Sequence, residues 1–501
     1  MKRLLSIVLF WPTILFAHIG SPVVIADGVA GPYPLRVVIR PPDVIPGRAQ
    51  IDVQLLRPVD VATQVFVLPV TAAAGLHGAP APDEAIAVVG DPALRHGELW
   101  LMTVGSYSVH VTVRGPAGTG TFIVPVDAIA TQVLPMPKAT EVVLAVLGLI
   151  LFLGAISLAA AAAKEGTLDP AQAISRRDRS RGFLVGFGAL VFFGYLLFAG
   201  KSWWDRADVW HRSNEIYHPL PLSAQVSHGV NGSNVLQLAI DTSKLDSDEP
   251  LSVLPDHGKL MHLFVMREPK LDVFAHLHPV QVTPGNFVVT LPALPPGDYT
   301  LYADITSKMG FAATLTTRLA LPPSPAASLD QETSHADASA GDTKTSAPSI
   351  DPDDAWINAD WATRSKAVPA TLEQVGEKTF YADMPLSLNF RAVNGRGEPI
   401  ESEPYMGMLG HAAIRKTDGS VFAHLHPLGT ISMASQDFFA TQAAQQTRGI
   451  VKQLPELCEA GVNVSFPYEF PSAGAYRIWV QTRVKGEIVT GVFDLNVLPP
   501  K

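Results

Sequence analysis

A six-residue phrase that contains two histidines occurs twice in the chain. Residues 274–279 and residues 422–427 both spell Phe-Ala-His-Leu-His-Pro. Residues i and i+2 of a β-strand point to the same face, so each phrase places two imidazoles side by side. A further histidine, His262 or His411, precedes the pair by 14 or 13 residues. Three imidazoles on one hairpin can hold a metal ion, and we predict one such site in each repeat.

The turn of the second repeat predicts how its histidines face one another. Asp418-Gly419 is a strong signal for a tight two-residue hairpin turn. With these two residues as the loop, His411 lies directly opposite His426. His424 lies diagonally across on the same face, within the 7–8 Å that is usual for such neighbours. We therefore predict that His411, His424 and His426 share one metal ion.

The first repeat predicts the same triangle with a slightly longer loop. If the loop is three residues centred on Lys270, His262 lies opposite His278 and shares a face with His276. His257, just upstream, is a candidate fourth ligand of this hairpin.

The chemistry of the neighbouring residues favours copper, with zinc as the main alternative. Met406 or Met408 could supply a thioether, although alternation points Met408 away from His411 unless a bulge forms. Asp256 in the first repeat has no counterpart in the second. A hydrolytic zinc site needs a general base nearby. The missing shared carboxylate therefore favours metal binding over hydrolysis.

The N-terminal residues predict export and one more metal ligand. Residues 1–17 have the basic start, apolar run and small final residue of a signal peptide, with an uncleaved anchor as the alternative. Cleavage after Ala17 would give His18 a free amino group beside its ring, which together can chelate copper. A second ligand of such a histidine brace would be His77, His96 or His110. The eight predicted metal ligands are thus His262, His276, His278, His411, His424, His426, His257 and His18.

Two uncharged runs predict a membrane hairpin. Residues 142–163 and 182–200 are each long enough to cross a bilayer as a helix. The loop 164–181 between them carries five Lys or Arg residues, which predicts that it is cytoplasmic. Both large flanks then lie outside, in the periplasm or extracellular space. This places the chain in a bacterial inner membrane, with the lipid bilayer as a partner.

The remaining sequence predicts a mostly β protein with three Ig-like β-sandwich domains. A Gly-x-Tyr strand followed by a final strand closes each of the predicted domains, residues 18–135, 217–323 and 355–500. Residues 324–354 are rich in Ser, Ala, Asp and Thr and predict a flexible linker. The predicted fold is therefore three sandwiches with a two-helix transmembrane hairpin after the first.

Composition excludes some classes of function. The 501-residue chain has a net charge of −9, so it offers no basic surface for nucleic acid. Cys458 is its single cysteine, so neither an intrachain disulfide nor a thiolate-rich metal site can form.

The two histidine hairpins resemble those of bacterial YtkA-like domains. The similarity lies in Gly258-Lys-Leu-Met-His-Leu-Phe264 with Asp272-Val-Phe-Ala-His-Leu-His-Pro279, and in Met408-Leu-Gly-His411 with residues 418–427. Such domains are small exported β-sandwiches, similar in style to FixH-like and CopC-like copper proteins. The resemblance covers the second and third domains and implies an exported copper-binding role without a specific enzyme activity.

These observations lead to one preferred function and two alternatives. The preferred function is a membrane-anchored protein that binds and traffics copper through two three-histidine sites, with another periplasmic copper protein as a potential partner. The first alternative is a copper-dependent oxidase or monooxygenase that uses His18. The second is a structural or adhesion module whose histidines bind no metal.

Overall fold

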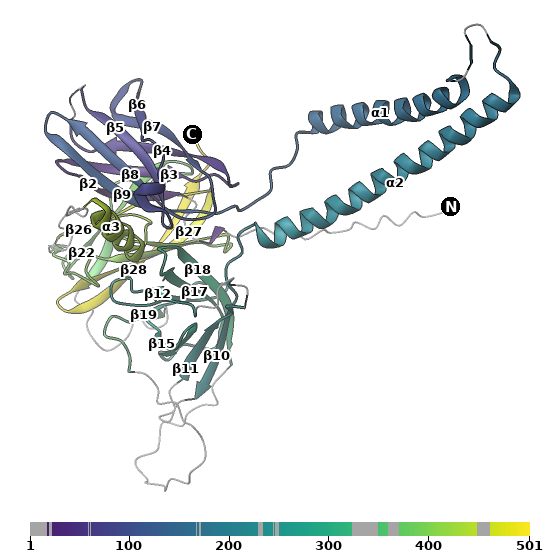
Figure 1. Ribbon diagram of the computed structural model, residues 1–501. Coiled ribbons are helices and arrows are strands. Elements are labelled where there is room, and N and C mark those ends of the chain that lie inside the picture. The colour runs from purple at the N-terminus through teal and green to yellow at the C-terminus, as the bar shows by residue number, and fades with distance from the viewer. Residues whose placement is uncertain are drawn as a thin grey trace, which may run out of the picture. The chain divides into compact units, whose positions relative to one another are not determined.

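The structure is a computed structural model of a largely β protein with three helices in the residues that it describes (Figure 1). It describes residues 18–19, 23–58, 60, 62–166, 168–169, 172–228, 234–243, 245, 250–322, 349–358, 370–447 and 461–501. The predicted signal peptide, most of the predicted linker and Cys458 lie outside these residues. The chain divides into two compact units, Ile129–His218 and the rest, and each is described by itself.

The first β region, residues 23–128, is one antiparallel sheet of eight strands. They run in the order β2-β3-β4-β7-β6-β5-β8-β9. Alternate residues of β4, among them Ala49, Ile51 and Val53, are buried in the core of this region, as expected for a sheet with one apolar face. The strands are β2 (Val24–Ala30), β3 (Tyr33–Arg40), β4 (Gly47–Leu55), β5 (Gln64–Thr71), β6 (Asp83–Val88), β7 (Asp91–Leu101), β8 (Gly105–Gly115) and β9 (Gly118–Ala128), with a 3-10 turn η1 (Gly75–Gly78) after β5.

The second β region, residues 219–322 with 349–358, has two sheets around one apolar core. One sheet has the order β10-β11-β16-β15 and the other β12-β17-β13-β14-β19, with β18 also paired to β17. β19 pairs with β14, so residues 355–358 extend the second region, whereas the sequence prediction assigned them to the third domain. The strands are β10 (Leu222–His228), β11 (Asn234–Ile240), β12 (Val253–Leu254), β13 (His262–Arg267), β14 (Val273–Leu277), β15 (Val280–Thr283), β16 (Asn286–Thr290), β17 (Gly297–Ser307), β18 (Ala312–Leu321) and β19 (Ala355–Asn358).

The third β region, residues 370–501, repeats this two-sheet plan. One sheet has the order β1-β25-β24-β27-β28-β21 and the other β20-β22-β23, with β26 paired to β22. A helix, α3 (Met433–Thr447), follows the histidine hairpin. The strands are β1 (His18–Ile19), β20 (Thr371–Val375), β21 (Phe380–Tyr381), β22 (Pro385–Val393), β23 (Pro399–Ile400), β24 (His411–Lys416), β25 (Val421–Leu425), β26 (Asn463–Glu469), β27 (Gly474–Val484) and β28 (Glu487–Leu498).

Both histidine hairpins have the predicted register. In the second region Leu263 pairs with Leu277, and in the third region Ala413 pairs with His424. The turn of the second hairpin differs from the prediction, because β24 ends at Lys416 and β25 starts at Val421, which leaves a four-residue loop. Two-residue and four-residue loops centred on the same point give the same strand pairing, so the register is unaffected.

The histidine-bearing faces of the two hairpins pack against each other. Within each region the opposite face of the hairpin covers that region's own core, so the outer faces carry both the histidines and large apolar residues. Phe274 of β14 stacks on Trp479 of β27 at 4.9 Å between ring centroids, and Phe422 of β25 stacks on Tyr302 of β17 at 4.0 Å. These two contacts are the same contact with the regions exchanged, as in the symmetric interface of a dimer.

The first region packs on the third. The segment after β25 lies along β2, where the Asp27 amide donates to the Leu428 carbonyl at 2.8 Å and the Thr430 amide to the Ile25 carbonyl at 2.9 Å. Phe439 of α3 packs against Ile123 of β9 in a small apolar cluster. The first region therefore contacts both α3 and the segment between the second histidine hairpin and α3.

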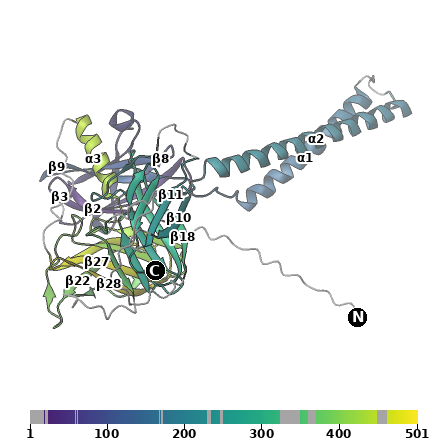
Figure 2. The ribbon, with the colours of Figure 1, turned by 90° about the horizontal axis from the view of Figure 1, so that it is seen from below.

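The second unit contains two long apolar helices that lie side by side (Figures 1 and 2). They are α1 (Lys138–Glu165) and α2 (Arg176–Asn214), and both are long and apolar enough to span a membrane. Ser175 caps α2, since its hydroxyl accepts from the Asp178 amide while the Asp178 carboxylate accepts from the Ser175 amide. Gly182 of α2 lies directly against α1, where an added Cβ would be 3.0 Å from the Ala160 carbonyl.

Candidate metal centre

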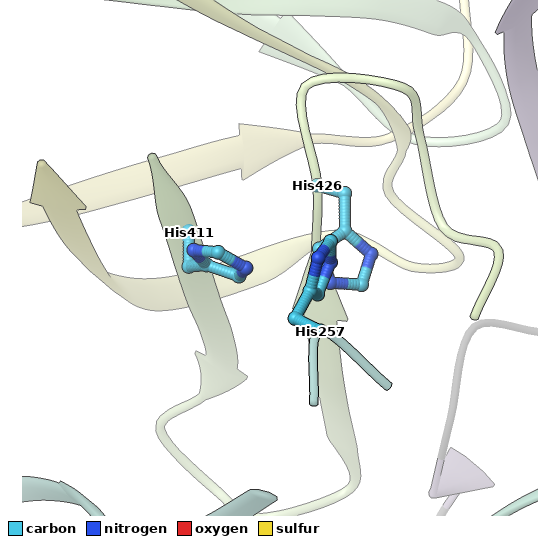
Figure 3. Close-up of side chains that lie close together, drawn as sticks. All are labelled: His257, His411 and His426. Carbon is cyan, nitrogen blue, oxygen red and sulfur yellow. The ribbon is translucent and has the colours of Figure 1, made fainter. Parts of the chain in front are cut away.

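Seven histidine rings from the second and third regions gather in one buried cluster. His262, His276 and His278, which we call the hairpin group, all come from the second region. His257, His411 and His426, which we call the bridging group, come from both regions (Figure 3). Within each group one ligand nitrogen per ring lies within 4.8 Å of the others. Each group therefore has the composition and spacing of a three-histidine metal site.

The bridging group differs from the predicted set. The prediction joined His411 and His426 to His424 of the same hairpin, but the structure joins them to His257 of the second region, at ring distances of 5.2 and 5.1 Å. His424 instead directs Nδ1 at Asp304 of the second region, at 3.2 Å. The difference arises because the hairpin faces pack on each other, which brings side chains of the other region as close as those of the same hairpin.

Four of the seven rings are oriented by a hydrogen bond through one nitrogen to an oxygen, and a fifth, that of His424, directs one nitrogen at a carboxylate oxygen. The acceptor is in each case an oxygen, so the bonded nitrogen donates and the other ring nitrogen keeps its lone pair in a neutral imidazole. The pairs are His262 Nε2 with the Asp256 carbonyl at 3.2 Å, His276 Nδ1 with Gln481 Oε1 at 2.9 Å, His278 Nδ1 with Asp354 Oδ1 at 3.0 Å, His424 Nδ1 with Asp304 Oδ2 at 3.2 Å and His426 Nδ1 with the Ile431 carbonyl at 3.0 Å. Metal-binding histidines are typically held in this way.

Two of these contacts cross between the regions in a symmetric manner. Asp304 stands opposite His262 on β17, and Gln481 stands opposite His411 on β27. Asp304 Oδ2 lies 3.2 Å from His424 Nδ1 of the third region, and Gln481 accepts a hydrogen bond from His276 of the second. Each region therefore orients a histidine of the other. The sequence could have indicated that Asp304 and Gln481 are equivalent, because each lies five positions after the tyrosine of the repeated Gly-x-Tyr strand.

Several of the remaining ring nitrogens are buried without a hydrogen-bond partner, although His257 Nε2 lies 3.5 Å from Asp256 Oδ1. They are Nε2 of His257, His278, His424 and His426, and both ring nitrogens of His411. A buried polar atom without a hydrogen bond costs about 1–3 kcal/mol. Metal coordination would satisfy these nitrogens.

The closest contact between two rings of the cluster joins two nitrogens whose donor and acceptor roles depend on the tautomers. His262 Nδ1 and His276 Nε2 are 3.1 Å apart. In the tautomers that donate to the Asp256 carbonyl and to Gln481 Oε1, neither of the two facing nitrogens carries a hydrogen. Two facing lone pairs repel unless a cation lies between or beside them. The residues therefore fit a metal ion at this point.

Burial keeps the imidazoles neutral and available as ligands. Loss of hydration, reinforced by the other histidines, lowers the pKa of His276, His411 and His424 well below the usual value. The pKa of His262 falls to about 3 and that of His426 to about 4, again chiefly through burial. Protons therefore compete weakly with a metal ion for these nitrogens.

Two carboxylates border the cluster. Asp256 accepts hydrogen bonds through Oδ2 from the Ser432 hydroxyl at 2.9 Å and the Met433 amide at 3.2 Å, while its buried Oδ1 has no hydrogen-bond partner. Burial raises the pKa of Asp304 to about 7 despite a hydrogen bond from Thr314.

A third set of potential ligands, His278 with Asp351 and Asp354, lies at the edge of the cluster. The ammonium of Lys259 lies 2.7 Å from both carboxylate oxygens of Asp351 and 3.2 Å from Asp353. This acidic set thus already has a cation.

The first-region candidates lie apart from the groups described above. His110 is buried in β8, His96 is exposed and 2.7 Å from Asp52, and His77 lies within the short turn η1. The backbone of His18 pairs with Val421 of β25, next to the third region. The histidine brace therefore remains a prediction.

Comparisons with known proteins add little to this geometry. Residues 369–498, the third region, match a family described as "Domain of unknown function (DUF8832)". No curated protein matches the chain. Solved structures with similarity include a red sea bream transglutaminase, at 10% identity over 58% of this chain and 33% of that one, with a TM-score of 0.14. Dimeric latent PorU from Porphyromonas gingivalis shows 8% identity over 96% of this chain and 34% of that one, also with a TM-score of 0.14. This chain thus spans about a third of either protein, and scores this low carry no argument about fold or function.

Proposed function

We propose that this protein is a membrane-anchored metal-binding protein that holds two metal ions, with copper as the best candidate, in the interface of its second and third β regions. One ion would occupy the hairpin group and the other the bridging group. The single observation that carries this proposal is the set of buried ring nitrogens that have no hydrogen-bond partner, on His257, His278, His411, His424 and His426.

The imidazole ligands and the proposed location of the sites in the periplasm support copper. Imidazole binds copper and zinc well, and affinities at a given nitrogen site rise towards copper in the first-row series. In the proposed topology α1 and α2 cross the inner membrane, and the basic loop between them is cytoplasmic. The three β regions, which we propose are Ig-like sandwiches, would then lie in the periplasm, where a copper-handling protein meets its metal.

The arrangement of the sites supports holding and handing over a metal ion, without catalysis. The prediction of one site on each hairpin gives way to a proposal in which the two regions share one centre, since His257 lies in a group with His411 and His426. Transfer of the bridging ion to another periplasmic protein would then require movement at this interface.

The test is the metal content of the purified full-length protein in detergent, with copper and zinc offered together. We expect two copper ions per chain, loss of one in His276→Ala/His278→Ala, and loss of the other in His411→Ala/His426→Ala. His96→Ala, at an exposed ring outside the cluster, is the matched control and should keep both ions. Absence of bound metal at micromolar supply would reject the proposal and favour a packing role for the histidines.

A further inference from the structure

The turn that carries His257 has a twin in the third region. Asp256 and Lys259 exchange backbone hydrogen bonds of 2.8 and 2.9 Å around His257 and Gly258. In the third region Tyr405 and Met408 do the same, at 2.6 and 3.2 Å. The two central residues of the twin turn are Met406 and Gly407.

The backbone of the two turns is nearly identical. His257 and Met406 both have a φ of 51°, and Gly258 and Gly407 have 80° and 78°. A non-glycine residue with positive φ is uncommon and costs conformational energy. Each turn also lies five residues before the upstream histidine of its hairpin, His262 or His411. Met406 is therefore the structural counterpart of His257.

The contacts between the regions repeat when the regions are exchanged. Phe274 on Trp479 corresponds to Phe422 on Tyr302. The hydrogen bond from His276 to Gln481 corresponds to the contact of 3.2 Å between His424 Nδ1 and Asp304 Oδ2. The twin turns lie close together, since a Cβ on Gly407 would be 3.7 Å from His257 Nδ1.

Exchanging the second and third regions also indicates where the side chain of Met406 lies. His257 reaches from the second region into the third and lies beside His411 and His426. The counterparts of those two residues are His262 and His278. We infer that Met406, which is buried, reaches in the opposite direction and supplies a thioether ligand to the hairpin group.

This ligand makes the two ions chemically different, and the inference rests on the proposed function. Thioether sulfur is a soft ligand that favours copper(I), whereas the imidazole ligands of the bridging group suit divalent ions such as copper(II) and zinc. The hairpin group with Met406 is thus a copper(I) site, and the bridging group is a divalent site. The sequence prediction had placed Met406 or Met408 with the histidines of their own hairpin, and the exchange of regions redirects Met406 to the other one.

X-ray absorption of the copper(I)-loaded full-length protein tests the inference. A Cys458→Ser background removes the single thiol. We expect a copper–sulfur contribution that disappears in Met406→Leu, together with a loss of copper(I) affinity at one of the two sites. Met408→Leu is the matched control, since Met408 on the same turn packs against Leu428 and Met433. It should keep both signal and affinity.

A second variant gives an independent readout. Met406→His introduces the residue that the twin turn carries as His257. We therefore expect two bound ions and no copper–sulfur signal, and we expect the metal preference of the hairpin group to shift from copper(I) towards zinc. Two copper ions without a sulfur signal in the parent protein would overturn the inference and leave the proposed function standing. A signal that survives in Met406→Leu, or is lost in Met408→Leu, would overturn it as well. A parent protein without copper would overturn both.

Discussion

At the scale of single residues, the proposed metal centre depends on histidine rings in which one nitrogen donates a hydrogen bond to an oxygen and the other nitrogen keeps its lone pair for a metal ion. His276 has one nitrogen fixed by Gln481 and the other 3.1 Å from His262. Sequence spacing could predict which histidines share a hairpin face, because alternation along a strand is local. It could not predict that His257 joins His411 and His426, because alternation fixes the direction of a face and leaves open what that face packs on.

Substitution of Gln481 tests whether a residue of the third region orients a metal ligand of the second region. Gln481→Leu removes the acceptor for His276 Nδ1, so the ring loses its fixed tautomer and orientation. We expect metal affinity at the hairpin group to fall by about 10–100-fold, as measured by chelator competition. Gln481→Glu keeps an acceptor oxygen and should remain close to the parent. Equal affinity in the leucine variant would show that this cross-region bond plays no part.

His110 makes a prediction about acid stability. Burial lowers its pKa to about 4, against 6.5 for the unfolded chain. The folded state resists protonation, so the stability from this residue is fully present above pH 6.5 and is lost as the pH falls towards 4, by about 3 kcal/mol in total. His110→Gln cannot protonate at this position. We therefore expect its denaturation midpoint to fall less than that of the parent protein when the pH is lowered from 7 to 4. A difference that is constant with pH would contradict this.

At the scale of strands and hairpins, the two repeats act as equivalent halves of one interface. The prediction of register succeeded because the turn signal at Asp418-Gly419 centres the hairpin whether the loop has two residues or four. The sequence prediction contains no helix over 433–447. The fold needs α3 there because it covers Ile123 on the outer face of the first region, a contact that no local pattern reveals.

The paired aromatic contacts test this equivalence. Phe274→Ala and Phe422→Ala each remove a fully buried ring from the interface, and we expect each to lower the free energy of unfolding by about 3–5 kcal/mol and to weaken metal binding. Val280→Ala, at a side chain that is 54% exposed on β15, should change stability by no more than about 0.5 kcal/mol. Loss of metal binding in only one of the phenylalanine variants would argue against equivalent halves. Chemical denaturation and metal content together provide the readout.

At the scale of the whole molecule, three β regions pack as one compact unit and a second unit supplies two apolar helices. The sequence predicted both helices from hydrophobic length. Their polar ends extend beyond the predicted spans, since pairs such as Lys201 with Asp205 at 2.7 Å continue α2. The sequence analysis did not predict the shared cluster of aromatic side chains between the second and third regions, because residue patterns indicate the strands of a domain and not what packs on its outer face.

The proposed topology predicts the location of two fusion points. Alkaline phosphatase, which is active only outside the cytoplasm, should be active when fused after residue 216. A green fluorescent protein inserted near residue 172, in the basic loop, should fluoresce because that loop faces the cytoplasm. The reverse pattern would place the histidine centre in the cytoplasm.

The most direct test of the central claim is a crystal structure of the copper-loaded protein with anomalous data at the copper absorption edge. The proposal predicts two anomalous peaks, one among His262, His276 and His278 and one among His257, His411 and His426. Peaks confined to other parts of the chain, or no peak at all, would contradict a metal centre shared between the second and third β regions.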